Sequence, residues 1–342
     1  MGALVLLEND LLRITVDPMV GGTIRTVEHR ELGLQVLGKV PWKPEGTPLD
    51  PATVKDERIW LTRYAGGWPI LFPNGGDACT FHGVFHGFHG EGSIAPWDMQ
   101  MDDRAIMLRR RFQTVPVEME REITLDGDLV VIREAARNTS AEPVAVIWGH
   151  HPSFGSDLLD GPVELQSSAR GFMSDEHYDA PANPLRPGGK GRFPMVSAKG
   201  PTTGMAKAAL FDLSRPREPL SAMTCLSDFP PKITGGAWVT IRRLDNAIGV
   251  ALSWDETLFP YAWLWFEMGG LTEEPWAGKT RLIGVAPNTT WPANGLADAE
   301  ERGGRLLILA PGQAVAARLR LQVFKPNGAV RSVDPNTGRV HG

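Results

Sequence analysis

Residues 309–324 read LAPGQAVAARLRLQVF, and this stretch shows the pattern that decides the fold class. Apolar and polar residues alternate with a period of two after the turn signal Pro311-Gly312. The apolar members are Val315, Ala317, Leu319, Leu321 and Val323, and Arg318, Arg320 and Gln322 stand between them. Successive side chains of a strand point to opposite faces, so this spacing predicts a β-strand with one buried and one solvated face.

The same alternation recurs along the chain and begins near the N-terminus, where Leu12, Ile14 and Val16 alternate with Arg13 and Thr15. Turn signals at 126–128 and 245–246 separate such runs. Further strands are predicted at 106–112, 129–136, 144–150, 237–243, 248–254, 261–267 and 305–310, and one short helix at 296–302. With 38 Gly, 28 Pro and no long 3.6-residue period, the chain is predicted to be an all-β, antiparallel, sandwich-like protein.

Composition narrows the class of protein. Hydrophobic residues make up 42% and charged residues 22%, as in an ordinary soluble globular protein, and the net charge of −5 argues against a nucleic-acid binder. No apolar run approaches the roughly 20 residues that span a membrane. The N-terminal stretch lacks the basic region of a signal peptide, and two cysteines are too few for a disulfide framework. We therefore expect a cytoplasmic protein; its oligomeric state is not predicted.

Histidines concentrate in two short segments. Residues 81–97, FHGVFHGFHGEGSIAPW, hold His82, His86, His89 and Glu91, and WGHHPSF adds His150 and His151. Such a titratable constellation is suited to proton transfer or metal binding. Imidazole and carboxylate together suit Zn, Mn or Fe, so His82, His86, His89 and Glu91 are the candidate ligands if a metal is bound. The alternative for each histidine is a loop residue bonded to backbone or water, and no metal or other cofactor is expected.

Several segments, taken in order, resemble the aldose 1-epimerase (galactose mutarotase-like) superfamily. They are the opening ENDLLRITVDPMVGG, then GGWPILFPN followed by HGE and PW, then GHHPSF, and finally LAPGQAVAARLRLQVF. The resemblance covers nearly all 342 residues. It implies one galactose mutarotase-like antiparallel β-supersandwich domain, residues 1–342, with a sugar cleft across a concave face.

The resemblance also implies roles for individual residues. In this family a base removes the anomeric hydroxyl proton and an acid protonates the ring oxygen, so that the pyranose opens and recloses. The acid falls on His151 and the sugar-orienting histidine on His89, with His86 as a competing alignment. The residues expected to contact the sugar are Asn74, His86, Glu91, Trp97, Phe154, Trp265 and Trp291.

One departure from the family pattern affects the base. In VAPNTTWPANGL, Ala286 stands where the family glutamate belongs, and alanine cannot accept a proton. The family arginine near FPN also has no counterpart, because two glycines follow Asn74. Alternation places Tyr261, Trp263, Trp265 and Glu267 on one strand face, which makes Glu267 the candidate substitute base. Glu91, two residues after His89, is the second candidate.

The sequence thus predicts an aldose 1-epimerase-like isomerase that acts on a monosaccharide or sugar derivative. Two alternatives stay open: a metal-dependent carbohydrate isomerase, lyase or hydrolase on the same fold, and a non-catalytic sugar-binding protein. The Pro- and Gly-rich segment 180–204 carries four cations, Arg186, Lys190, Arg192 and Lys199, and no acid. It is expected to be a solvated loop or a lid, and its charge suggests that the sugar is anionic.

Overall fold

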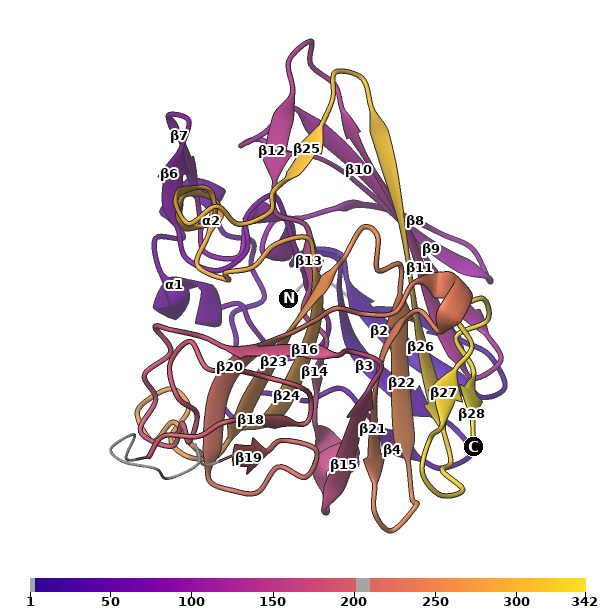
Figure 1. Ribbon diagram of the computed structural model, residues 1–342. Helices are drawn as coiled ribbons and strands as arrows, with labels where there is room; N and C mark the ends of the chain where they lie inside the picture. The colour runs from indigo at the N-terminus through magenta and orange to yellow at the C-terminus, as the bar shows by residue number, and fades with distance from the viewer. Residues whose placement is uncertain (1–3, 201–209) are drawn as a thin grey trace.

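Two large antiparallel sheets form most of the protein in this computed structural model, which describes residues 4–200 and 210–342 (Figure 1). The first sheet has the order β15-β21-β22-β26-β11-β10-β9-β8. Its strands are β15 Val163–Ser167, β21 Ala237–Arg243, β22 Gly249–Trp254, β26 Ala314–Phe324, β11 Leu129–Asn138, β10 Val117–Asp126, β9 Ala105–Arg111 and β8 Asp98–Met101.

The second sheet carries the functional site described below. Its order is β17-β16-β20-β23-β24-β13-β5, and β14 also pairs with β24. The strands are β17 Lys190–Gly191, β16 Gly171–Ser174, β20 Leu220–Ser227, β23 Tyr261–Met268, β24 Arg281–Asn288, β13 Gly149–His150, β5 Ile70–Leu71 and β14 Ser153–Phe154.

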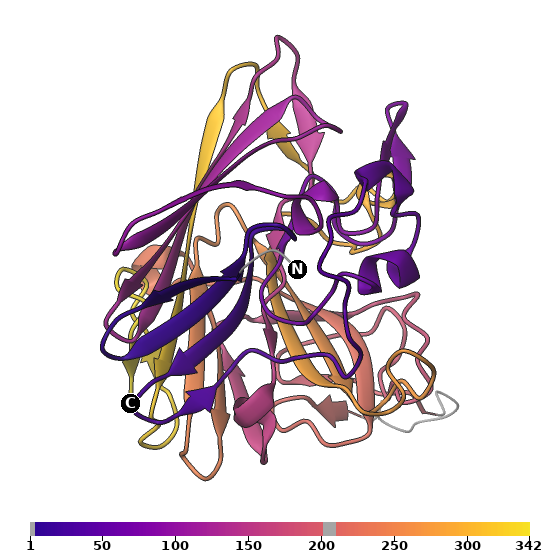
Figure 2. The same cartoon turned by 180° about the vertical axis from the view of Figure 1, so that it is seen from behind.

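Smaller elements surround these sheets. Figure 2 shows nearest the viewer the N-terminal four-stranded sheet, β1 Val5–Glu8, β2 Leu12–Asp17, β3 Thr23–His29 and β4 Leu34–Gln35. Four strand pairs complete the sheet structure: β6 Cys79–Phe81 with β7 Val84–His86, β12 Val144–Val146 with β25 Leu307–Leu309, β18 Met195–Ser197 with β19 Leu210–Asp212, and β27 Ser332–Val333 with β28 Val340–His341. The helices are α1 Glu57–Leu61 and α2 Leu296–Glu301, with short 3-10 turns at Pro51–Thr53, Glu91–Ser93, Ser156–Leu159 and Lys232–Thr234. None of the helices in the described part of the chain is long and apolar enough to cross a membrane.

The main core lies between the two large sheets. Leu319 and Leu321 of β26 pack in the same apolar cluster as Leu264 and Phe266 of β23, and all four are fully buried. Their neighbours on β26, such as Arg318, face solvent. The alternation at 315–323 therefore has the physical origin that the sequence analysis predicted, one face on the core and one in water.

Most predicted strands are confirmed within a residue or two, and the differences have physical reasons. The predicted strand 144–150 is divided into β12 and β13. Between them the chain leaves β25, and its next two N–H groups donate to the Pro73 carbonyl and to the Thr289 hydroxyl. The unpredicted β24 is buried almost throughout and so shows no alternation. The unpredicted α1 spans five residues, too few to display a helical period, and is capped by Asp56. The segment 180–204 contains β17 and β18, and its residues 201–204 lie outside the described residues.

Candidate functional site

A cavity of about 260 Å³ lies against the second sheet on the face opposite the main core. Strands β20, β23 and β24 form its floor, and α1 and the segments around residues 77–89 and 175–178 form its walls. The lining side chains are aromatic, acidic and imidazole groups: Glu57, Trp60, Leu61, Tyr64, Asp77, Phe88, His89, His151, Asp175, His177, Tyr178, Met223, Trp263, Trp265, Trp276, Gly284, Ala286, Ala293 and Asn294.

The floor follows from strand alternation. On β23, Leu264 and Phe266 point into the main core, whereas Trp263 and Trp265 line the cavity. On the neighbouring β24, Ala286 pairs with Trp263, and it lines the cavity too. The shared face predicted for Trp263 and Trp265 is thus confirmed, and Ala286 occupies a position from which a longer side chain would enter the cavity.

His89 is fixed by a two-way contact with Gly76. The His89 N–H donates to the Gly76 carbonyl at 2.9 Å, and the Gly76 N–H donates to His89 Nδ1 at 2.9 Å. Because Nδ1 accepts, the neutral ring carries its proton on Nε2. His89 has a left-handed φ of 57°, a conformation that a non-glycine residue keeps only when its surroundings enforce it.

His151 is held by a chain of hydroxyl groups. Its Nδ1 lies 3.0 Å from Ser153 Oγ, which lies 2.6 Å from the Tyr64 hydroxyl. Burial raises the pKa of Tyr64 well above its ordinary value, so the phenol keeps its proton, and either hydroxyl of the Tyr64–Ser153 pair can donate to the other. The backbone N–H of His151 donates to the Pro69 carbonyl at 2.9 Å, which fixes the start of this segment.

Burial favours the neutral form of His89 and His151. It lowers the pKa of His151 to about 4 and that of His89 well below its usual value, and in His89 the nearby His151 adds to the effect. The two ring centroids lie 5.6 Å apart. At neutral pH the site therefore presents two uncharged imidazoles side by side.

Indole rings enclose the imidazoles. Trp60 meets His89 edge-on at 4.8 Å between centroids, and Trp265 meets His151 at 5.8 Å. Trp276 continues this wall, 5.7 Å from Trp265. Such aromatic faces suit the C–H faces of a sugar ring, and they limit the entry of water.

Sequence reasoning missed the acidic side of the cavity. Asp175 is buried, and its Oδ1 accepts hydrogen bonds from the backbone N–H groups of His177 and Tyr178 at 2.7 and 2.8 Å. Glu57 stands on the unpredicted α1, and Asp77 follows the Gly75-Gly76 turn. No periodic pattern or motif marks these positions, because each belongs to a loop or to a single helical turn. The Asp175-Glu176-His177-Tyr178 run was the only local signal.

We compared the sequence and the structure of this chain with those of known proteins. No protein-family model and no curated protein sequence matches the chain. A solved structure from Synechocystis sp. PCC 6803 matches with a TM-score of 0.65 at 18% identity, over 95% of this chain and 97% of the other. A galactose mutarotase related enzyme from Lactobacillus acidophilus matches with a TM-score of 0.60 at 17% identity, over 96% and 99% of the two chains. The chain has the galactose mutarotase-like fold. An aldose epimerase homologue from C. elegans also matches, with a TM-score of 0.60 at 13% identity over 95% and 99%.

This mutarotase-like fold confirms the predicted fold class, and it allows each predicted site residue to be located. His89, His151 and Trp265 line the cavity, as does Ala286. Glu267 does not line it: the carboxylate is fully buried, and its Oε1 accepts hydrogen bonds from the N–H groups of Gly270 and Leu271 at 2.9 and 3.0 Å. These two hydrogen bonds hold the turn that follows β23. Burial raises the pKa of Glu267.

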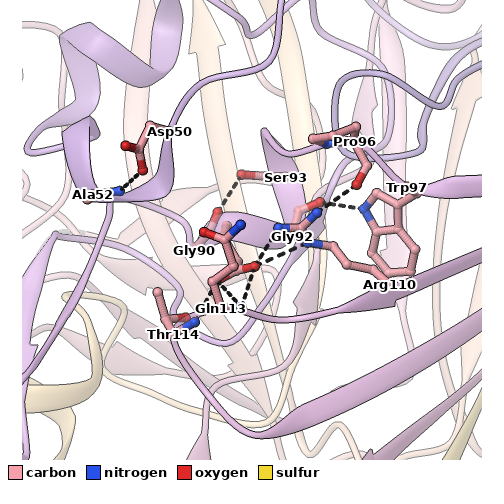
Figure 3. A network of polar contacts seen from close by, with 11 residues as sticks. Asp50, Ala52, Gly90, Gly92, Ser93, Pro96, Trp97, Arg110, Gln113 and Thr114 are labelled. Carbon is pink, nitrogen blue, oxygen red and sulfur yellow. Dashed lines mark hydrogen bonds and ion pairs between the residues drawn. The ribbon is translucent and has the colours of Figure 1, made fainter.

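Glu91 anchors the segment 110–114 and does not line the cavity. Its carboxylate accepts hydrogen bonds from Arg110 Nη2 at 2.6 Å and from the backbone N–H groups of Gln113 and Thr114 at 3.0 and 2.9 Å. Figure 3 shows Arg110, Gln113 and Thr114 converging on this network, with Trp97 donating to the Gly92 carbonyl beside it. Because these protein donors occupy its carboxylate, Glu91 has a structural role.

The other predicted contacts are also structural. Asn74 donates to the carbonyls of Asp77 and Gly87 and accepts from the Leu296 N–H, so it ties three segments together. Trp97 and Phe154 belong to the main core, and Trp291 packs against the small apolar cluster that contains Ala286 without lining the cavity.

The remaining histidines do not gather around a common point. His82 is exposed, stacks on Phe81 and lies 3.5 Å from Glu300. His86 is buried away from the cavity, and burial lowers its pKa to about 4. His150 points into the core, where it accepts from Trp68 and lies 3.0 Å from Glu134. Within residues 4–200 and 210–342, no three His, Cys, Asp or Glu side chains are grouped to hold a metal ion.

The cations of the segment 180–204 also lie away from the cavity. Arg186, Lys190, Arg192 and Lys199 are exposed, and none of them lines it. Among residues 4–200 and 210–342, no lysine or arginine lines the cavity. The suggestion of an anionic sugar therefore receives no support from the position of these side chains.

Proposed function

We propose that this chain is an aldose 1-epimerase-like isomerase, which interconverts the anomers of a monosaccharide by ring opening and reclosure. The observation that carries the proposal is the pair of neutral imidazoles, His89 and His151, 5.6 Å apart in an aromatic-walled cavity. The mutarotase-like fold supports a carbohydrate ligand. At about 260 Å³ the cavity falls just below the roughly 300–1,000 Å³ range of ligand sites, which suits a single sugar ring.

His151 is the proton carrier in this proposal. As a neutral base it removes the proton from the anomeric hydroxyl, and the C1–O5 bond breaks as the C1–O1 carbonyl forms. The imidazolium then delivers the same proton to O5, which gives the open-chain aldehyde. Rotation about C1–C2 and the reverse sequence close the ring on the other face. Because O1 and O5 are both attached to C1, one imidazole can serve both oxygens.

His89 supplies a hydrogen bond and no proton. Its Nδ1 is occupied by the Gly76 N–H, so only the Nε2–H is available to the sugar. A donor at this position stabilises the negative charge that builds on O5 as the ring opens. This assignment agrees with the sugar-orienting role expected from the sequence.

A single proton carrier removes the need for a second catalytic carboxylate. Ala286 lies in the cavity where the resemblance expects the base, and it offers no acceptor. Glu267, the predicted substitute, lies outside the cavity with Oε1 already engaged. The proposal therefore assigns both transfers to His151, and it uses neither carboxylate.

Anomer exchange tests this function directly. Purified protein is added to equilibrated glucose, galactose and glucosamine, and exchange between α and β signals is measured by NMR with and without a chelator. The proposal expects faster exchange that the chelator does not change. Loss of exchange with the chelator would favour the metal-dependent alternative. Sugar-dependent tryptophan fluorescence without exchange would favour a binding protein, for which the alanine at position 286 is the supporting observation.

A further inference from the structure

A charged network lies inside the main core, and the proposed reaction does not use it. Arg121 of β10 and Glu134 of β11 stand opposite each other in the first sheet, and both side chains are fully buried. Arg121 Nε lies 3.1 Å from Glu134 Oε1. Glu134 Oε2 lies 3.0 Å from Nε2 of His150, which is also fully buried. Because His150 belongs to β13 of the second sheet, the network joins the two sheets across the core.

The surroundings of this network are apolar. The neighbours two positions away on the same strand faces all belong to the main core: Met119, Ile123, Ile132 and Ala136. Charges in such a place lose their hydration, and apolar residues of similar size often give equal or greater stability. Moreover, Arg121 Nε and Nη2, Glu134 Oε1 and His150 Nε2 form no well-aligned hydrogen bond within the described residues. Stability alone therefore does not account for the network.

The His150 ring is held at both of its nitrogen atoms. Its Nδ1 accepts a hydrogen bond from the Trp68 indole N–H at 3.2 Å, so the neutral ring carries its proton on Nε2, which faces Glu134. The same Glu134 oxygen accepts from the Trp148 indole N–H at 3.2 Å. Burial acts to raise the pKa of Glu134, but His150 and Arg121 outweigh it and lower the pKa, which keeps the carboxylate charged.

His150 and His151 are consecutive, and their side chains point to opposite sides of the chain. His150 enters the core, whereas His151 lines the cavity. The backbone offers little further restraint here, because β13 has two residues and Pro152, which follows His151, has no N–H to donate. A rotation of the peptide between the two histidines would move both rings. The contacts of His150 therefore limit the freedom of His151 to turn away from a sugar.

We propose that Arg121 and Glu134 are positioning residues for the proton transfer: they hold the His150 ring, and the fixed His150 orients His151. This inference rests on the proposed function and adds to it the residues that aim its proton carrier. Arg121, Glu134 and His150 do not line the cavity, so they act through His151 and not on the sugar. Misplacement of a reacting group by about 1 Å can cost about a hundredfold in rate, so a looser His150 should lower kcat.

Two double variants separate the charges of the network from its contact with His150. Arg121→Met/Glu134→Met removes both charges and the oxygen that faces His150. Arg121→Met/Glu134→Gln removes the same charges but keeps an oxygen that can accept from His150. Anomer exchange is measured by NMR at equal concentrations of folded protein. We expect the first variant to lower kcat about tenfold with KM unchanged, and the second to return kcat close to the wild-type value.

Arg242→Met/Glu164→Met is the matched control. Glu164 and Arg242 form another cross-strand pair of the first sheet, 2.6 Å apart, on the edge strands β15 and β21. Neither residue lines the cavity. This variant should leave both kcat and KM unchanged, because its pair does not restrain His150.

Trp68→Phe provides a second route if the first double variant does not fold. It removes the N–H that bonds to His150 Nδ1 and leaves both charges in place, so kcat should fall several-fold with KM unchanged. Wild-type kcat in this variant or in Arg121→Met/Glu134→Met, a change in KM alone, or equal losses in the two double variants would overturn the inference while the wild-type exchange upholds the proposed function. Absence of exchange in the wild-type protein would overturn the proposed function, and this inference with it.

Discussion

His89 and His151 belong to separate segments of the chain, yet their rings lie 5.6 Å apart in one cavity. Each is held through Nδ1, His89 by the Gly76 N–H and His151 by the Ser153 hydroxyl, which leaves Nε2 for a ligand. The predictions below follow from this pairing and from the contacts that fix it.

The pH dependence of anomer exchange should follow His151. Its pKa of about 4 means that the neutral base persists down to mildly acidic pH. We expect exchange per enzyme molecule to be flat from about pH 7 to 5.5 and to fall below that as the imidazole gains a proton. A rate profile with its midpoint near the ordinary histidine pKa of about 6.5 would contradict the assignment.

The stability of the fold should decrease in acid because of His86 and His151. A histidine whose pKa is lower in the folded state binds fewer protons folded than unfolded, so its stabilising contribution is complete above about pH 6.5 and is lost as the pH falls towards 4. Burial lowers the pKa of both His86 and His151 to about 4. Chemical unfolding at several pH values should show a decrease of a few kcal/mol across this range, and His86→Gln should reduce the slope without changing exchange.

The hydroxyl chain should act on rate more than on binding. Tyr64→Phe removes the hydroxyl that hydrogen-bonds with Ser153, and Ser153→Ala removes the contact with His151 Nδ1. We expect each to lower kcat about tenfold with little change in KM, at a stability cost of about 1–2 kcal/mol. Because both act through one imidazole, the double variant should lose little more than either single one. Additive losses, or losses in KM alone, would show that the chain does not position His151.

Gly76 should be irreplaceable for a local reason. A Cβ at this position would lie 1.6 Å from the Ala293 carbonyl oxygen, and φ is +85°. Gly76→Ala should therefore displace the loop that holds His89, and it should cost more than about 2 kcal/mol together with most of the exchange activity. Gly83→Ala is the control: its φ is +81° but nothing lies within 4 Å of the new Cβ, so only the backbone strain remains. Similar behaviour of the two variants would argue against the clash.

Glu91 should matter for folding and not for chemistry. Glu91→Gln leaves the buried Arg110 without its charge partner, and breaking such a pair costs about 3–5 kcal/mol. The remaining folded protein should retain its exchange rate per molecule, measured below the melting temperature. If Glu91→Gln abolished exchange in a stably folded protein, Glu91 would have a catalytic role that its contacts do not suggest.

The sequence allowed the fold to be predicted because its strands alternate where one face meets water. β26 shows this clearly. β23 is buried on both faces, yet alternation still placed Trp263 and Trp265 on one face, the face that lines the cavity. β24 could not be found in this way, because burial on both faces removes the alternation.

The site was predictable only in part. His89 and His151 stand in short motifs that resemble a known family, and both line the cavity. Glu91 and Asn74 stand in the same motifs, but they bond to backbone groups, and no sequence pattern distinguishes a buried anchor from a ligand contact. Glu57, Asp77 and Asp175 reach the cavity only through tertiary packing of loops and of one helical turn, which local sequence does not encode.

The most direct test of the central claim is the exchange rate of His151→Asn against that of His82→Asn. Both replace an imidazole with an amide, but His151 lines the cavity and His82 is exposed outside it. Selective-inversion NMR on equilibrated glucosamine and glucose measures the exchange rate at equal concentrations of folded protein. We predict that His151→Asn reduces the enzyme-dependent rate by at least about a hundredfold, as removal of a general acid–base group does, while His82→Asn leaves it unchanged. Exchange that survives in His151→Asn at the wild-type rate would contradict the account.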